Sequence, residues 1–400
     1  MNKVIRYIGS KEKLINFLSE VIFNNYDQIK FLDGFTGTTV VSKYLQENTN
    51  FDLYLSDMSN YSEVLSSRLF LNECRESIFK YINEIINITI ENKNIHEGVF
   101  FNEFSINGRP TTIETSAFQN QTVNSRMFFT EDVGLKIDTI RFYISNLYNN
   151  KNINYYEKNL LLMLLVAFAD KNANTTSVYG AYLKKQNRET VPLNKDFSDI
   201  LKKEYNEKYK SPIKYYKGDI LDTLNKIEEL DVIYLDPPYN TRKYESNYHI
   251  LNYICDLDFN KNQIKENSKT GLPKLKTKNL FGSKKDTRII FEDMIVNAML
   301  KSKETYISYS TDGEMTFEEI KDICNKNNIS LENRSTRMEA PIFKREQTID
   351  RFESLCLDPQ NLNRIRSNNY IGVNTRLWNR DNYRPDVPEP ESQYSSLPKP

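Results

Sequence analysis

A chain of 400 residues with 39% apolar content can bury a sizeable core, and its length predicts two domains or one domain with large insertions. Lys plus Arg equals Asp plus Glu at 54 each, which argues against a nucleic-acid binder unless the basic residues gather on one face. The longest apolar run, 160–169, is about half a membrane span, and the four cysteines show no paired spacing. These features predict an intracellular chain without a membrane partner or a metal site.

The first predicted element is a helix that follows the segment 6–11. Apolar residues recur at helical spacing from Leu14 to Ile22, and Ser10 is a suitable N-cap. The Gly-Ser-Lys turn ahead of this helix offers backbone N–H groups, a hydroxyl and an ammonium, which suit a carboxylate or a phosphate. An ordinary helix start explains the same residues equally well.

Residues 31–38 predict a strand and a tight glycine turn, with a second helix starting at Val40. Asp33 is placed in this turn to receive a positively charged amino group. The next strand, 53–56, ends in Asp57 about twenty residues beyond the turn, where an acidic residue commonly holds ribose hydroxyls. The pattern predicts half of a nucleoside-cofactor site, and an ordinary βαβ unit is the alternative.

The strand pattern is lost between residues 61 and about 205. Amphipathic helices are predicted at 78–90 and 137–147, on either side of an irregular polar stretch at 104–126 that contains Arg109 and Arg126. A further helix is predicted at 157–169. A further stretch, 173–185, is rich in hydroxyl and amide side chains and ends in two lysines. Its composition suits phosphate contact, and an exposed loop is the equally supported alternative.

Two strands follow, at 215–217 and 231–235, and the second runs directly into Asp236-Pro237-Pro238-Tyr239. Prolines cannot continue a sheet ladder, so a carboxylate, a carbonyl and an aromatic ring are held at the carboxyl end of a strand, where ligands bind in open α/β sheets. Two acceptors that grip the hydrogens of an exocyclic amine would free its lone pair for reaction. The aromatic ring would stack on the base, a contact worth roughly 1–3 kcal/mol in nucleic-acid sites.

Beyond this motif the sequence predicts a structural role for His249, which has no visible nucleophile partner. Residues 261–288 carry nine Lys or Arg against two Asp or Glu, and they predict a mobile basic loop that supplies the local charge missing overall. A strand at 304–310 and a helix at 316–325 follow. After about residue 343 the pattern decays, and the proline-rich end predicts disorder.

Three motifs stand in one order along the chain: 7–11, 33–38 and 236–240. This arrangement resembles the S-adenosylmethionine-dependent, adenine-specific (N6) DNA methyltransferases of the D12 class. More narrowly, the segments 128–130, 137–141, 173–184 and 247–252 resemble the restriction-modification methylases of the FokI and NlaIII type. The resemblance spans about residues 5–315. It departs from the family pattern at Gly34, where a larger apolar residue is common, and at Thr39, where a second glycine is usual.

The resemblance implies a role for each matched residue. The implied S-adenosylmethionine site comprises Tyr7, Gly9, Ser10, Lys11, Asp33, Phe35, Gly37, Thr38, Asp57, Asp219 and Ile220. The first four would close over the methionine end, the next four form the main turn, Asp57 would hold the ribose, and the last two would border the adenine. The implied catalytic set, which would grip the flipped target adenine, is Asp236, Pro237, Pro238 and Tyr239.

The expected fold is α/β, a Rossmann-like doubly wound sheet with an inserted, mostly helical target-recognition region. The expected divisions are a first catalytic part (1–60), the target-recognition region (61–205), a second catalytic part (206–345) with a basic loop at 256–290, and a partly disordered C-terminal extension (346–400). The expected partners are double-stranded DNA and a separately encoded restriction endonuclease. The expected location is the cytoplasm of a bacterium or a virus-infected cell.

Several other functions compete with N6-adenine methylation. Methylation of cytosine at carbon 5 needs a cysteine after a proline, and no cysteine here follows one. Methylation of the cytosine N4 amine uses the same acceptor geometry and stays open, although Asp236 rather than Ser favours adenine. Methylation of RNA or of a protein glutamine is disfavoured because those enzymes commonly carry Asn at the position of Asp236 and lack a long insertion between the cofactor and catalytic motifs. A catalytically idle DNA-binding protein on the same fold is the alternative from a different class.

Overall fold

The computed structural model describes residues 4–7, 9–91, 95–111, 125–185, 189–207, 209, 211–238, 244–274, 284–310, 313–337 and 351–358. Its helices are α1 (Ile15–Val21), α2 (Val40–Asn48), α3 (Asn60–Ser66), α4 (Ile78–Ile90), α5 (Val99–Phe104), α6 (Glu131–Asn149), α7 (Tyr155–Asn172), α8 (Asp196–Glu207), α9 (Ile220–Lys226), α10 (Tyr244–Cys255), α11 (Lys284–Lys301) and α12 (Phe317–Lys326). Short 3-10 helices are η1 (Lys11–Leu14), η2 (Phe23–Asn25), η3 (Ser67–Glu73) and η5 (Lys261–Gln263). None of the helices described is long and apolar enough to cross a membrane.

Seven strands form one sheet in the order β3-β2-β1-β4-β5-β7-β6. The strands are β1 (Lys30–Asp33), β2 (Asp52–Asp57), β3 (Ile213–Lys217), β4 (Leu230–Leu235), β5 (Ser302–Ser310), β6 (Ser330–Arg337) and β7 (Arg351–Asp358). The first five in spatial order pair in parallel, whereas β7 is antiparallel to both β5 and β6. The mixed sheet confirms the predicted Rossmann-like α/β fold.

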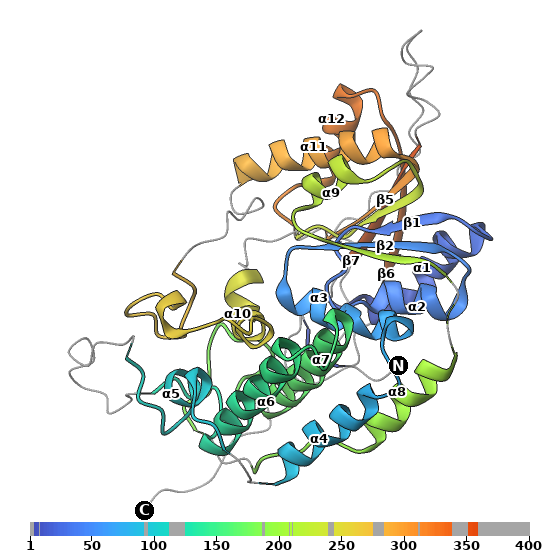
Figure 1. Cartoon of the computed structure of the whole chain (residues 1–400). Helices are drawn as coiled ribbons and strands as arrows, with labels where there is room; N and C mark the ends of the chain where they lie inside the picture. Colours follow the sequence, from blue (N-terminus) through green and yellow to red (C-terminus); the bar gives the residue numbers. More distant parts are fainter. Residues whose placement is uncertain are drawn as a thin grey trace, which may run out of the picture.

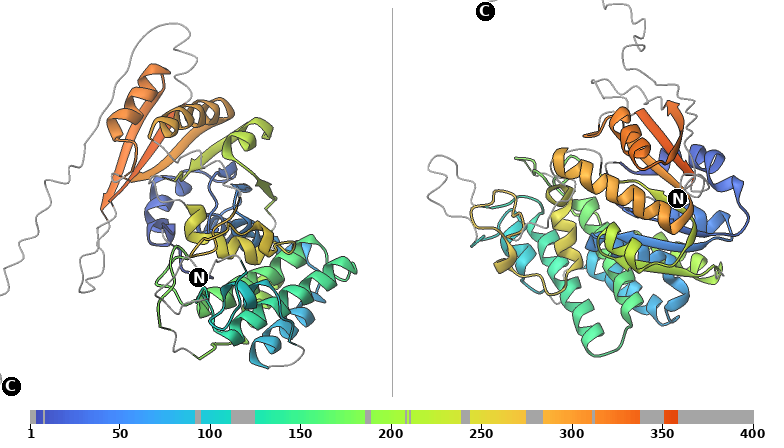
Figure 2. Two further views of the ribbon diagram at one scale, coloured as in Figure 1. Left: turned by 90° about the vertical axis from the view of Figure 1, so that its left-hand side faces the viewer. Right: turned by 90° about the horizontal axis from the view of Figure 1, so that it is seen from above.

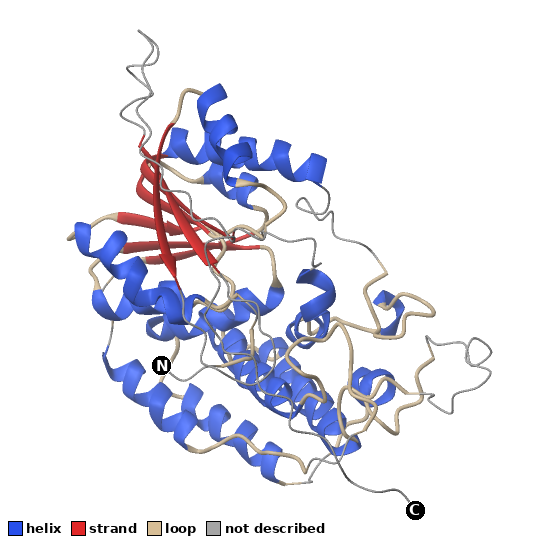
Figure 3. Cartoon of the chain, turned by 180° about the vertical axis from the view of Figure 1, so that it is seen from behind, coloured by secondary structure: helices blue, strands red, loops and turns tan. Residues whose placement is uncertain are grey.

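Each central strand is apolar on both sides because helices cover both faces of the sheet. Leu32 of β1 and Ile233 of β4 pack with α9, α11 and α12 on one face. Their neighbours Phe31 and Val232 pack with α1 and α2 on the other face, as the alternation of side chains along a strand requires. Figure 1 shows the three helices α9, α11 and α12 above the sheet and α1, α2 and α3 beneath it, and the view from behind in Figure 3 shows the same layers.

The part between β2 and β3 is helical, as predicted for residues 61–205. Its core is centred on α7, whose residues 160–166 are fully buried. Helices α3, α4 and α6 pack around α7, and α5 packs against α6. Helix α10 comes after β4 in sequence, yet its apolar residues belong to this second core rather than to the sheet. The helical part lies on the far side of α3 from the sheet (Figure 1).

The elements after β4 differ most from the sequence prediction. Helix α11 begins at Lys284, so residues 284–290 belong to a helix and not to the predicted basic loop 256–290. Strand β7 lies beyond the predicted boundary at 345, and it joins β5 to β6. Residues 351–358 are therefore part of the catalytic sheet rather than of a partly disordered extension. The left view of Figure 2 shows β6 and β7 extending from one end of the sheet.

Candidate active site at the carboxyl ends of the central strands

Three carboxylates stand at one edge of the sheet. Asp33 ends β1, Asp57 ends β2, and Asp236 follows the last residue of β4. Strand β1 lies between the other two strands, with Asp33 paired to Leu55 and to Tyr234. Because parallel strands end at the same edge, the fold brings together acids that are far apart in the sequence.

Asp33 is a buried carboxyl, with 3% of its surface exposed. Burial raises its pKa to about 7, and the nearby charges of Asp236 and Asp57 act in the same direction. The hydroxyl of Ser42 in α2 donates a hydrogen bond of 2.5 Å to Asp33 Oδ2 and opposes this shift. Such a carboxyl is poised to lose its proton when a positively charged group binds beside it.

Hydrogen bonds connect the turn after β1 to the neighbouring strands β4 and β2. The Gly34 N–H donates to the Tyr234 carbonyl at 2.8 Å, and the Gly37 N–H donates to Asp57 Oδ2 at 2.9 Å. The other oxygen of Asp57 accepts the Ser59 N–H at 2.8 Å. Gly37 has a φ of 51°, a conformation that suits glycine. The predicted turn therefore exists, and Asp57 shapes it directly.

The two departures from the family pattern have structural counterparts. Thr39 adopts a φ of 64°, so it takes the left-handed conformation that a glycine would adopt without strain. Gly34 faces the side chain of Leu235, because a Cβ added at residue 34 would lie 2.6 Å from its Cδ2 atom and 3.0 Å from Ile220 Cδ1. A larger residue at position 34 would therefore require these two side chains to move.

Lys11 connects the N-terminal segment to the catalytic motif. Its Nζ atom lies 2.7 Å from Asp236 Oδ2, and it also donates to the Gly9 carbonyl at 3.3 Å. The side chain of Lys11 is 7% exposed, whereas that of Asp236 is 18% exposed. The side chain of Asp236 is therefore partly exposed, whereas that of its counter-ion is enclosed. The sequence prediction placed Lys11 near the cofactor and did not foresee this contact.

Burial raises the pKa of Asp236, and the charge and hydrogen bond of Lys11 oppose the increase. Pro237 is buried and Pro238 is half-buried directly after it. Tyr239 and Asn240, the remaining residues of the predicted motif, lie outside the residues that the structure describes. The arrangement thus presents one carboxylate next to a fixed proline backbone at the end of β4.

Tyr7 lies against the glycine turn and on an aromatic cluster. A Cβ added to Gly37 would lie 3.7 Å from the Tyr7 Oη atom. The Tyr7 ring stacks on Tyr248 of α10 with 4.7 Å between centroids, and its hydroxyl lies 3.3 Å from that of Tyr61. Tyr61 was not among the predicted site residues, because a tyrosine that opens a helix carries no motif of its own.

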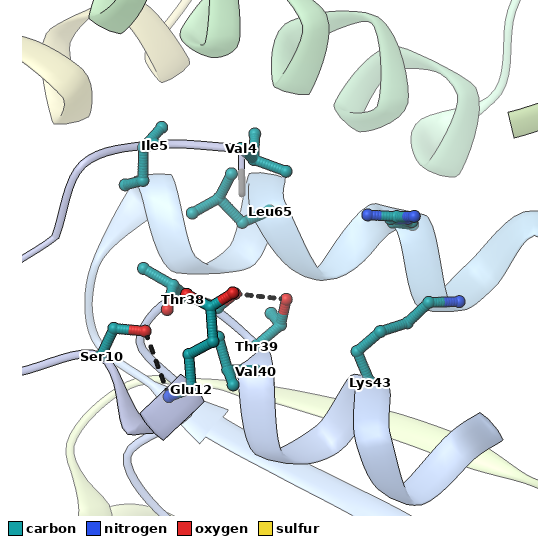
Figure 4. Close-up of a pocket in the computed structure, with 10 residues that line it drawn as sticks. Val4, Ile5, Ser10, Glu12, Thr38, Thr39, Val40, Lys43 and Leu65 are labelled. Atoms are coloured by element: carbon teal, nitrogen blue, oxygen red, sulfur yellow. Dashed lines mark hydrogen bonds between the residues drawn. The ribbon is translucent and has the colours of Figure 1, made fainter. Parts of the chain in front are cut away.

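Ser10 and Thr38 meet at a small pocket behind the turn. Ser10 caps η1 by accepting the Glu12 N–H at 3.5 Å, so the predicted cap is confirmed although the helix begins as a 3-10 turn. Figure 4 shows both residues facing the pocket beside Thr39 and Leu65. The full lining is Val4, Ile5, Ser10, Glu12, Thr38, Thr39, Val40, Lys43, Leu65 and Arg68.

The remaining predicted cofactor residues lie around the same strand ends. Phe35 is half-buried and packs on the core beneath α9 and α11. Asp219 caps α9 by accepting the Leu221 N–H at 2.9 Å, and burial raises its pKa. Ile220 is buried beside the turn, close to Gly34. The side chain of Asp219 therefore caps a helix, and the proposed contact with the cofactor would use the same side chain.

His249 confirms the structural role that the sequence predicted. Its ring nitrogens lie 3.0 Å from the Ser246 carbonyl and 2.7 Å from the Thr270 carbonyl. Burial lowers its pKa to about 4, so the ring is neutral at physiological pH. Arg126 is likewise enclosed, in an ion pair of 2.7 Å with Glu103. Neither residue is exposed to a substrate.

The parallel sheet with a glycine turn after β1, and Asp236-Pro237-Pro238 after β4, define a Rossmann-like methyltransferase. Sequence comparison identifies the family. Residues 7–323 match the family described as D12 class N6 adenine-specific DNA methyltransferase, and the chain belongs to this family. It is therefore an S-adenosylmethionine-using enzyme that methylates adenine in DNA at specific sites, which sets aside the cytosine, RNA, protein and non-catalytic alternatives.

Curated relatives are type II methyltransferases. The chain is 31% identical over 324 residues to M.NlaIII of Neisseria lactamica, which covers 80% of this chain and 87% of the relative. It is 29% identical over 324 residues to M.CviAII of Paramecium bursaria Chlorella virus 1, covering 78% and 85%. It is 30% identical over 328 residues to M.FokI of Planomicrobium okeanokoites, covering 80% of this chain but only 46% of that protein.

Proposed function

We propose that Asp236 and the Pro237 carbonyl accept the two hydrogens of the adenine N6 amine, with Tyr239 stacked on the base. The observation that carries this proposal is the position of Asp236 at the end of β4, partly exposed and paired with the enclosed Lys11. As the amine nitrogen bonds to the methyl carbon, the bond from that carbon to sulfur would break, and positive charge would develop on nitrogen until it loses a proton to solvent. The carboxylate of Asp236 stabilises that charge without reorganisation, because Lys11 and the prolines hold it in place.

The residues around the β1 turn fit S-adenosylmethionine. When bound, this cofactor supplies an electrophilic methyl group on a sulfonium centre. Asp33 offers a buried carboxyl for its ammonium group, and Gly37 has no side chain in the space beside Tyr7. We assign the cofactor to the whole predicted set, with Lys11 shared between the methionine end and Asp236. The chemistry needs no metal ion, since carboxylate and carbonyl acceptors alone orient the amine.

The DNA contact is assigned to the helical region and the segment after α10. Extruding the target adenine from the duplex costs a few kcal/mol, which contacts to the DNA must supply. The lysines at 184, 185, 261, 265, 269 and 274 are exposed in these two segments. They provide the local positive charge that phosphate binding requires in a chain with no net charge.

Replacing Asp236 tests the catalytic assignment. Asp236→Asn keeps the shape of the side chain but removes the negative charge, so we expect methyl transfer to fall at least about hundredfold. Binding of S-adenosylmethionine should change little. The measurements are transfer of a tritiated methyl group to duplex DNA and calorimetry of cofactor binding.

Asp231 offers a matched control at the opposite end of β4, where it pairs with Lys303 at 2.6 Å. Asp231→Asn should retain methyl transfer. Normal turnover by Asp236→Asn would exclude the proposed mechanism.

The names of the relatives also suggest a biological setting. The relatives named above are type II methyltransferases, and we infer that this enzyme protects cytoplasmic DNA from a separately encoded restriction endonuclease. Single-molecule sequencing of DNA from cells that express the protein would give the methylated sequence. An endonuclease that cleaves the unmethylated form of that sequence should fail on this DNA.

A further inference from the structure

Asp170 is a buried carboxylate that the mechanism above does not use. It lies at the end of α7 and is 3% exposed. Its Oδ2 atom accepts hydrogen bonds from the backbone N–H of Arg6 at 2.8 Å and from Arg6 Nε at 3.3 Å. Its Oδ1 atom accepts a hydrogen bond from the hydroxyl of Tyr179 at 3.2 Å. One carboxylate thus joins two segments that are distant in the sequence.

Arg6 makes further hydrogen bonds at this junction, and it precedes a residue of the proposed cofactor site. Its guanidinium donates to the Asp170 carbonyl at 2.6 Å and to the Thr175 carbonyl at 3.2 Å. The next residue is Tyr7, which lies against the glycine turn and stacks on Tyr248. Movement of residues 4–7 therefore moves a proposed cofactor contact. In Figure 4 this segment, labelled at Val4 and Ile5, passes along the helix that carries Leu65.

Tyr179 belongs to the DNA side. Its backbone N–H donates to the Asn247 carbonyl of α10 at 2.8 Å, and its ring is fully buried. Within the same loop, Asn174 binds the backbone of Leu183 in both directions, at 2.9 Å and 2.8 Å. These bonds hold the exposed Lys184 and Lys185 in one place relative to Asp170.

We propose that Asp170 is a positioning residue that holds segment 4–7 and loop 173–185 in one arrangement, so that cofactor binding and DNA binding favour each other. The inference rests on the cofactor and DNA roles proposed above. Because one carboxylate bonds both segments, a ligand that fixes the position of one segment also restricts the position of the other. The effect must be reciprocal, because each ligand changes the affinity for the second by the same factor.

Three variants separate this role from a purely structural one. Asp170→Asn removes the charge that Arg6 faces, and Tyr179→Phe removes one hydroxyl while keeping the ring in the core. The matched control is Glu157→Gln, at the other end of the same helix. Glu157 is 0% exposed and pairs with Arg75 at 2.6 Å, so it has comparable burial and an arginine partner without contact to either segment.

The measurement is the dissociation constant of S-adenosylhomocysteine by calorimetry on the full chain, with and without saturating sheared duplex DNA from methylation-deficient cells. The wild type should bind about tenfold more tightly with DNA, a typical coupling factor. Asp170→Asn should reduce that factor to near one and Tyr179→Phe should reduce it partly, whereas Glu157→Gln should keep it.

The inference would be overturned by a wild type that binds equally well with and without DNA, or by an Asp170→Asn variant with the wild-type factor. Loss of the factor in Glu157→Gln as well would show a general effect of destabilising α7, and it would also overturn the inference. A wild type that does not bind S-adenosylhomocysteine at all would instead count against the proposed cofactor site.

Discussion

Among single residues, Asp33 combines a proposed ligand role with a cost to stability. Its pKa is about 7 in the folded protein, against 3.8 for an ordinary aspartate. The folded state therefore binds more protons than the unfolded state between pH 4 and 7. Stability contributed by this residue falls as the pH rises through that window. A cofactor ammonium group beside the charged carboxylate would offset this cost. We therefore expect Asp33 to serve cofactor binding rather than stability.

Asp33→Asn should separate these two effects. The amide cannot ionise, so we expect the variant to be more stable than the wild type at pH 8, by on the order of 2–4 kcal/mol at ~1.4 kcal/mol per pKa unit. At pH 4 the difference should vanish, and cofactor affinity should fall at every pH where the wild-type residue is charged. Urea denaturation from pH 4 to 8 measures the first effect and calorimetry measures the second.

Asp231 provides a control of opposite sign. Burial alone would raise its pKa, but hydrogen bonds from Lys303 and from the Lys30 N–H outweigh burial and lower it. Its contribution to stability is present above the unfolded pKa and is lost as the pH falls. Asp231→Asn should thus destabilise the protein at neutral pH. A pH-independent effect of Asp33→Asn would contradict the raised pKa.

Among the elements, α6 connects two helix ends through residues one turn apart. The carboxylate of Asp138 accepts the backbone N–H groups of Gly98, Phe100 and Phe101, and so caps the start of α5. The guanidinium of Arg141 donates to four carbonyls at the end of α10, those of Tyr253, Ile254, Asp256 and Leu257. The motif 137–141, noted in the sequence only as a resemblance, thus fixes the helix that follows the catalytic segment.

Arg141→Lys should show the value of this cap. A lysine ammonium has three donors and no planar fork, so it leaves some of the four carbonyls unsatisfied in a buried site. We expect a loss of about 2–3 kcal/mol in the free energy of unfolding, measured by urea denaturation. Arg75→Lys is the comparison, because the side chain of Arg75 is 54% exposed and should lose under about 1 kcal/mol. Equal losses in the two variants would show that α10 does not depend on Arg141.

Elements with a local signal were predictable from the sequence. The apolar spacing of α4 gave its observed bounds, and Thr316 caps α12 in a capping box with Glu319. Strand β6 is mostly polar and α10 contains non-helical dihedral angles at Tyr248, so neither shows a clean period. The contact of Lys11 with Asp236 depends on the tertiary fold, which brings distant segments together. The same is true of the hydrogen bonds from Arg6 and Tyr179 to Asp170. The motifs therefore located the site, whereas the pairing of charges within it required the structure.

Across the whole molecule, the sheet does not end where the sequence pattern decays. Strand β7 is the middle member of the trio β5-β7-β6, and β5 in turn pairs with the catalytic strand β4. Removing β7 would leave β6 without a partner and would expose the edge of β5. Such unpaired edges favour association between molecules.

Two truncations test this arrangement. A chain that stops at residue 345, the predicted domain boundary, lacks β7, and we expect it to aggregate and to lose methyl transfer. A chain that stops at Asp358 keeps all seven strands, so it should retain cooperative unfolding and methyl transfer. Thermal unfolding and size-exclusion chromatography give the comparison. A folded, active chain ending at residue 345 would show that β7 is dispensable.

The place of β7 also sets the order in which the enzyme matures during synthesis. Six strands leave the ribosome before the seventh, which must then insert between two that already exist. In a nascent chain the edge of β5 therefore stays unpaired until residue 358 has been made. We expect the enzyme to begin modifying DNA only after β7 has left the ribosome and paired with β5 and β6.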